Sequence, residues 1–161
     1  LGRNALFKTE FELIKGRVGE IDIDYETWCR EGSSLEMVAR IAGVEDDLIK
    51  ISEIGHLEEK GAAGALLSRV SVSDNAEADI YNELTASAPQ AKGHVDCKEI
   101  VQDQAIAKAT PVVDVRHPLA RVTHEAAIGS VDSKQLQTLM ARGMSEEEAT
   151  SLIIQGMLRR Q

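Results

Sequence analysis

The sequence predicts an all-β body followed by a C-terminal helical hairpin. Short apolar runs alternate with polar residues through most of the chain, which is typical of half-buried strands. The alternating runs recur at intervals of 10 to 17 residues. After Gly129 the apolar spacing becomes helical. The 161 residues suit one domain with a small appendage, and we expect a core domain at 1–129 and a helical domain at 130–161.

The period-two pattern is clearest over residues 20–26, where four acidic residues alternate with apolar ones and predict a strand with one solvated face. The first eighteen residues fit either a strand or a helix. A polar, glycine-flanked stretch at 55–64 predicts a loop. Strands are expected to begin near residues 20, 35, 48, 65, 77, 94, 111 and 121. This spacing suits a β-sandwich or an irregular β-solenoid, and without a strict sequence repeat both remain open.

The end of the chain carries helix signals. Asp132 or Ser133 is the expected N-cap of a first helix, which Gly143 ends. Ser145 and Glu148 have the spacing of a capping box, in which each side chain bonds the other residue's backbone amide. The second helix is predicted to have an apolar face made of Ala149, Leu152, Ile153, Gly156 and Met157.

Charge and hydropathy narrow the classes of partner. The chain holds 27 acidic and 18 basic residues, giving a net charge of -9, and aromatic residues make up only 3%. Nucleic acids and anionic membranes attract positive surfaces, so neither is an expected partner. No apolar run approaches the ~20 residues that span a bilayer. The start of the sequence shows no signal-peptide pattern, and we expect a cytoplasmic protein with reduced thiols at Cys29 and Cys97.

Cys97 is one of two candidate chemical groups. A free cysteine on a strand usually acts as a small buried hydrophobe. The alternative is a thiolate that accepts sulfur or binds metal, with His94 and Lys98 lowering its pKa. Cys29 has no comparable neighbours and is expected to be structural.

The second candidate is the pair His124 and Glu125. On a strand, His124 shares a face with Val122 and Ala126, whereas Glu125 points the opposite way. Adjacent strand residues diverge, so this pair is not expected to be a catalytic dyad. The sequence also lacks a phosphate-binding glycine loop, a CxxC pair and an HExxH motif. We therefore do not expect an enzyme.

Residues 121–129 resemble the HEA segment of SufB, a member of the SufBD core family. Residues 136–157, with the run SEEEA and the sequence LIIQGM, look like the tail of the same family. Residues 95–98 fall where SufB places its "QCD" cysteine. The resemblance is specific over about forty residues at the C-terminus, and it weakens toward the N-terminus.

The resemblance implies a right-handed parallel β-helix followed by a small helical domain. It also implies a scaffold on which an iron-sulfur cluster is transiently assembled. In this family the helical tail docks the ATPase SufC, so ATP would act only through that partner. Two core subunits pair through their β-helices, and a homodimer is the expected assembly.

By the same resemblance, Cys97 matches the SufB cysteine that receives sulfur or ligates the cluster. His124 and Glu125 match the residues proposed as further ligands. A two-fold dimer would bring Cys97 and His124 of both chains together if they lie near the axis. The residues expected to serve the tail's docking role are Ser145, Glu148, Leu152, Ile153 and Met157. The competing interpretation is a short SufBD paralogue that binds or regulates another protein and carries no cluster.

Overall fold

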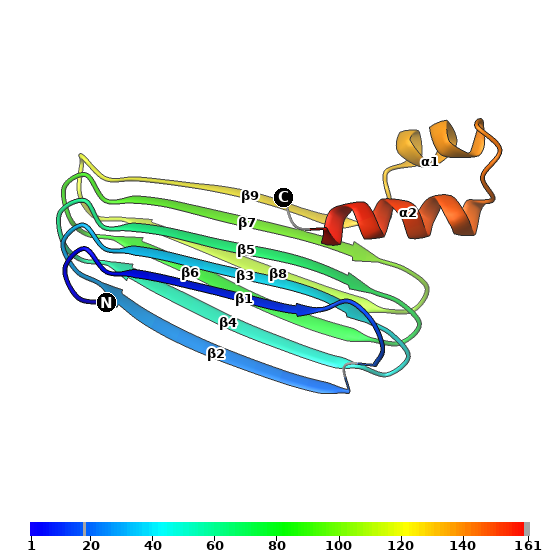
Figure 1. Cartoon of the computed structure of the whole chain (residues 1–161), viewed down its shortest axis with the longest axis horizontal. Coiled ribbons are helices and arrows are strands. Elements are labelled where there is room, and N and C mark those ends of the chain that lie inside the picture. The colour runs from blue at the N-terminus through cyan, green and yellow to red at the C-terminus, as the bar shows by residue number, and fades with distance from the viewer. Residues whose placement is uncertain (18, 160–161) are drawn as a thin grey trace.

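The protein is a parallel β-solenoid with two helices at its C-terminal end (Figure 1). The structure is a computed structural model and describes residues 1–17 and 19–159. Two sheets face each other: sheet A has the order β1-β3-β5-β7-β9 and sheet B the order β2-β4-β6-β8. The strands are β1 (Leu6–Leu13), β2 (Glu20–Cys29), β3 (Ser34–Gly43), β4 (Leu48–Leu57), β5 (Ala63–Val72), β6 (Glu77–Ala86), β7 (Lys92–Val101), β8 (Ile106–Val115) and β9 (Arg121–Gly129).

The structure decides between the two architectures that the strand spacing left open. Every neighbouring pair of strands within a sheet is parallel, and each strand from β1 to β7 pairs with the strand two places later in the chain. The chain therefore coils, placing one strand in each sheet per turn. The predicted solenoid with a helical tail is confirmed. The undecided N-terminal segment contains β1, while its last residue, Val18, lies outside the described residues.

Two boundaries differ from the sequence prediction. The stretch 55–64 is not all loop, since β4 continues to Leu57 and β5 starts at Ala63. The strand β8 starts at Ile106, five residues before the expected position, because the run 107–109 is extended although its inward side chains, Ala107 and Ala109, are small. Both differences have the same cause: parallel pairing with a full-length neighbour extends a strand beyond its own alternating pattern.

The amino-acid sequence shows no strict repeat, but the backbone conformation of the turns does repeat. Glu45, Asp74 and Asp103 all have positive φ, between 56° and 58°, and lie 29 residues apart. Aspartate and asparagine tolerate this left-handed conformation better than most residues, and Asp occupies two of the three positions. The amide of Glu45 donates to Asp74 Oδ2 at 2.9 Å, and the amide of Asp74 donates to Asp103 Oδ2 at 3.2 Å. The same turn shape, held by bonds between successive coils, therefore sets the solenoid's period.

The next position in that series is Asp132, and there the solenoid stops. Asp132 is the N-cap of α1 (Ser133–Met140), and its Oδ1 accepts the amide of Gln135 at 2.7 Å. Of the two N-caps proposed from sequence, Asp132 is therefore correct. The helix α2 (Glu146–Leu158) follows after Gly143, whose φ is +94°. The predicted helical domain runs to residue 161, and its last two residues lie outside the described part of the chain.

The space between the sheets is filled by alternate side chains of both. Two clusters of buried apolar residues occupy it, one around Leu66 and Leu84 and one around Ile51 and Ile80. The other alternate residues point outward, including the acidic series of β2, which is solvent-exposed as the sequence predicted. Since β9 pairs only with β7 among the described strands, its inward-facing residues have no further coil above them.

Candidate functional site

The thiol of Cys97 points into the interior of the solenoid. Cys97 lies on β7 and is fully buried in the same apolar cluster as Val95 and Leu66. Its Sγ donates to Oδ1 of Asn82 on the opposite sheet, at 3.3 Å. Burial raises the pKa of Cys97 to about 11, with the charges of Glu99, Asp96 and Glu53 adding to the effect. The expectation that His94 and Lys98 would lower this pKa is wrong, because alternate residues of β7 project outward from the sheet.

Cys97 is part of a polar cluster inside the otherwise apolar core. The amide Nδ2 of Asn82 donates to Glu53 Oε2 at 2.8 Å, so Asn82 links Cys97 to Glu53. On the other side, Ser68 Oγ donates to Glu99 Oε1 at 3.4 Å. Burial raises the pKa of both Glu53 and Glu99 to about 7. Sequence reasoning missed this cluster. The sequence does contain a sign of it, because at each of these positions a polar residue interrupts the apolar residues that otherwise alternate along the strand.

His124 lies on the same face of sheet A as Cys97 but not beside it. The strand register places His124 next to Val95, whereas the neighbour of Cys97 on β9 is Ala126. The imidazole is exposed, because β9 is the last strand of its sheet. The structure therefore brings Cys97 and His124 to one side of one pair of strands, separated by a diagonal step of two residues.

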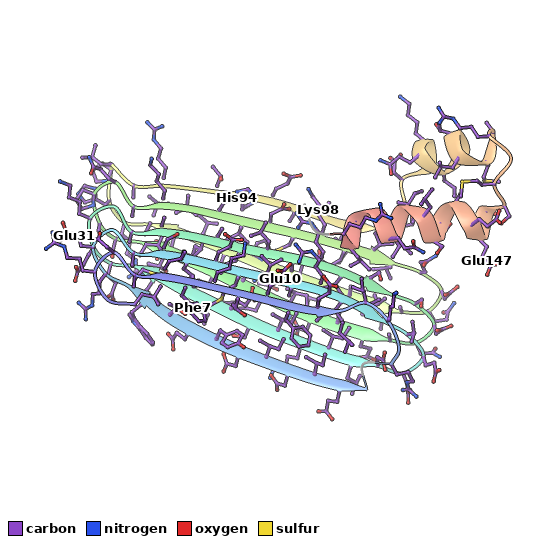
Figure 2. The ribbon with its side chains drawn as sticks, in the orientation of Figure 1. Phe7, Glu10, Glu31, His94, Lys98 and Glu147 are labelled. Atoms are coloured by element: carbon purple, nitrogen blue, oxygen red, sulfur yellow. The ribbon has the colours of Figure 1, made fainter. Side chains whose placement is uncertain are left out.

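Glu125 lies on the opposite, outer face. Its register neighbour is Asp96, and Lys98 Nζ is 3.1 Å from Glu125 Oε1 and 3.6 Å from Asp96 Oδ1. Asp96 also forms an ion pair with the buried Arg69. Figure 2 labels Lys98 close to the helical pair and His94 further along the same strand. The outer face thus joins Glu125 to Asp96 and Lys98, and separates it from the thiol of Cys97.

The helical tail combines a structural cap with an exposed apolar surface. The predicted capping box is present: the amide of Glu148 donates to Ser145 Oγ at 3.2 Å, and the amide of Ser145 donates to Glu148 Oε2 at 2.9 Å. These side chains are thus engaged within the helix. Leu152 is 44% exposed, Ile153 and Met157 are half-buried, and Leu152 and Ile153 line a groove between α1 and α2. Figure 1 shows the pair projecting beyond the ends of the sheet A strands.

A metal ion needs several ligands gathered at one point, and a membrane span needs a long apolar helix. Within 1–17 and 19–159, no three His, Cys, Asp or Glu side chains gather closely enough to hold a metal ion. Both cysteines are free and buried. Across the described part of the chain, neither helix has the length and apolar character needed to cross a membrane.

Comparison with known proteins gives consistent matches. Residues 84–157 match the family model described as "SUF system FeS cluster assembly, SufBD core domain". An iron-sulfur cluster assembly SufBD family protein of Methanocaldococcus jannaschii is 39% identical over 98% of this chain and 50% of its own length. Two SufBD family proteins of Pyrococcus horikoshii are 37% and 32% identical over 98% of the chain, covering 48% and 35% of their lengths.

The chain thus spans about half the length, or less, of these curated relatives. The family model covers β7, β8, β9 and both helices, which is the part of the molecule where the candidate residues lie. The parallel solenoid, the helical tail and these matches agree, and the chain belongs to the SufBD family.

Proposed function

We propose that the protein is a scaffold subunit for iron-sulfur cluster assembly, acting in the cytoplasm. The observation that carries the proposal is the position of β9. This strand is one of the two edge strands of sheet A, bears both His124 and Glu125, and lies directly beside the strand of Cys97. Family membership supports the same function. The cluster is cargo that is built and passed on, and the protein itself is not an enzyme.

Thiolate, imidazole and carboxylate are all suitable ligands for iron. In this proposal Cys97 accepts sulfur or binds the nascent cluster. His124, on the same face, and Glu125, on the outer face of the same edge strand, supply further ligands. Cys97 is buried and its pKa is about 11, so it must be uncovered before it reacts. Among the described strands, only β9 adjoins β7 on that side of sheet A, and a local separation of the two strands would expose the thiol.

Pairing of two subunits through β9 would supply the remaining ligands. An edge strand has backbone donors and acceptors with no partner in its own sheet and therefore favours association. A second copy of this chain, or another SufBD core subunit, is the proposed partner. A two-fold axis beside β9 would place two sets of Cys97 and His124 near each other.

The helical tail is the proposed docking element for a SufC-type ATPase. Leu152, Ile153 and Met157 offer apolar surface, and the box of Ser145 and Glu148 fixes the start of α2. ATP binding and hydrolysis would take place on the partner, and closure of two ATPase subunits would pull on two tails.

Anaerobic reconstitution with ferrous iron and sulfide tests the scaffold function. Wild type is expected to bind iron and acid-labile sulfide with a charge-transfer spectrum, and Cys97→Ser is expected to lose most of both. Cys29→Ser is the matched control, since Cys29 is also a free, fully buried thiol in the same core. Equal cluster content in Cys97→Ser and wild type would refute the role of Cys97.

The burial of Cys97 favours a second candidate function. A SufBD paralogue that binds another protein without carrying a cluster would keep this cysteine as a core residue with a protonated thiol. Reconstitution separates the two functions, because such a paralogue would contain neither iron nor sulfide after the same treatment.

A further inference from the structure

We infer that Asp96 and Glu125 form a binding site for a divalent cation on the outer face of sheet A, and that Lys98 occupies this site as an exchangeable counter-ion. The identity of the cation as ferrous iron rests on the proposed function; the site itself rests on the geometry of the two strands. It is distinct from the thiol of Cys97, which faces the interior.

The two carboxylates are neighbours by the register of the sheet. Asp96 of β7 pairs with Glu125 of β9, and both side chains project outward. Adjacent strands lie about 4.8 Å apart, so two acidic residues at one register position repel each other unless a cation lies between them. Lys98 supplies that charge, with its Nζ 3.6 Å from Asp96 Oδ1 and 3.1 Å from Glu125 Oε1.

Asp96 carries the feature that points to a ligand. Its side chain is only 10% exposed, and its Oδ1 is buried without a hydrogen-bond partner among the described residues. A buried acceptor in that state costs on the order of 1–3 kcal/mol. The ammonium of Lys98 reaches it only at 3.6 Å. A metal ion bonded to Oδ1 would satisfy this oxygen more closely than Lys98 does.

The other half of the Asp96 carboxylate is held in place by Arg69. The guanidinium forms an ion pair with Asp96 Oδ2, and its Nη1 also donates to the backbone oxygens of Asp96 at 3.0 Å and Ser68 at 2.8 Å. Arg69 is itself buried, so few other positions are open to its guanidinium. Partners in the outer coordination sphere that orient a carboxylate in this way are typical of metal sites.

The ligand set suits a hard or borderline divalent ion with open positions. Two carboxylates bind Mn²⁺ or Fe²⁺ through oxygen and leave sites for water, sulfide or a residue of a second subunit. His94 lies on the same face two residues before Asp96, but its Nδ1 is bonded to Thr123 Oγ1 at 2.9 Å. Lys98 is 35% exposed, so its flexible chain can turn toward solvent when a metal replaces it.

Titration with Mn²⁺ alone, followed by electron paramagnetic resonance, tests the inference on the whole chain. Lys98→Gln removes the competing cation and is expected to bind Mn²⁺ about tenfold more tightly than wild type. Glu125→Gln is expected to bind at least tenfold more weakly. Glu125 is 60% exposed, so this variant should fold, whereas Asp96→Asn would weaken the buried pair with Arg69.

Lys108→Gln is the matched control, because Lys108 contacts a single outward carboxylate, Asp79, at 3.4 Å. Its Mn²⁺ affinity should equal that of wild type. Unchanged affinity in Lys98→Gln, or binding by Glu125→Gln as tight as wild type, would overturn the site. Anaerobic Fe²⁺ is expected to displace the bound Mn²⁺. If Fe²⁺ failed to displace Mn²⁺, iron would be excluded as the metal of this site. No sulfide is present, so a failed cluster reconstitution refutes the proposed scaffold function without altering these results.

Discussion

Glu53 and Glu99 place carboxyl groups inside the solenoid, where burial raises the pKa of each to about 7. Both stand in strands whose other inward residues are apolar. Glu53 is bonded to Asn82, and Glu99 Oε2 is buried without a partner among the described residues. Burying a carboxyl group at these two positions costs desolvation free energy that an apolar residue would avoid. The neighbour that the two carboxyl groups share is Cys97, whose pKa they help to raise.

Glu53 makes the stability of the protein dependent on pH. In the folded chain its pKa of about 7 exceeds the ordinary value of 4.5, so the folded state holds this proton over a range where the unfolded chain has released it. The stability that this protonated carboxyl contributes is therefore fully present below about pH 4.5 and is lost as the pH rises to about 7, by about 3 kcal/mol. The groups facing Glu53 are Asn82 on β6, Tyr25 at the same register position of β2, and Cys97 across the core.

Glu53→Gln is expected to remove this part of the pH dependence. The amide oxygen of glutamine still accepts the bond from Asn82, so the variant should be more stable than wild type at pH 8 and nearly equal at pH 5. Urea unfolding at the two pH values measures the difference. Glu77→Gln, at an exposed position of the neighbouring strand, should follow wild type. A Glu53→Gln variant that loses as much stability from pH 5 to pH 8 as wild type would contradict the argument.

At the scale of elements, the turns hold successive coils in register. Asp74 has a φ of +58° and accepts the amide of Glu45 from the preceding coil at 2.9 Å. The residue thus has two roles, one in backbone conformation and one in bonding. Glycine at this position keeps the first role and loses the second, whereas alanine loses both.

Asp74→Ala is therefore expected to destabilise the chain more than Asp74→Gly does. The lost hydrogen bond costs each variant about 1 kcal/mol. The left-handed backbone costs alanine roughly a further 1 kcal/mol. The urea concentrations at the unfolding midpoints, compared between variants with the same m-value, measure this order of stability. If the glycine variant were the less stable of the two, the conformational role would be wrong.

The same turns help to explain which features of the structure the sequence alone could predict. Strand positions and the capping box of α2 were predictable because they depend on local alternation and on a fixed spacing of Ser145 and Glu148. The 29-residue period was not visible, because residues as different as Gly61 and Gln90 take the same left-handed turn position. The polar interior was also missed, since which face of a strand is buried depends on its partner sheet. For the same reason the sequence could separate His124 from Glu125 but could not pair Glu125 with Asp96.

At the scale of the whole molecule, a stiff solenoid carries a helical pair at the end of one sheet (Figure 1). The buried residues of α2 are Ala149, near its start, and Leu158, at its last turn. Leu158 lies in a hollow lined by Ile14 and Ala42 of the coils below. The intervening Leu152 remains exposed. A helix with buried residues near both ends and an exposed apolar residue between them is suited to contact a separate protein without disturbing the solenoid.

Leu152→Glu is expected to abolish co-purification with a SufC-type ATPase and to leave the solenoid intact. A charge on the exposed apolar surface would have to be buried in the complex, which costs far more than its solvation in the free chain. Ser151→Glu is the matched control, since it adds the same charge one residue earlier at another exposed position of α2. Affinity capture measures binding, and circular dichroism confirms the fold of each variant. Undiminished capture of the ATPase by Leu152→Glu, or equal loss in Ser151→Glu, would exclude this surface as the docking site.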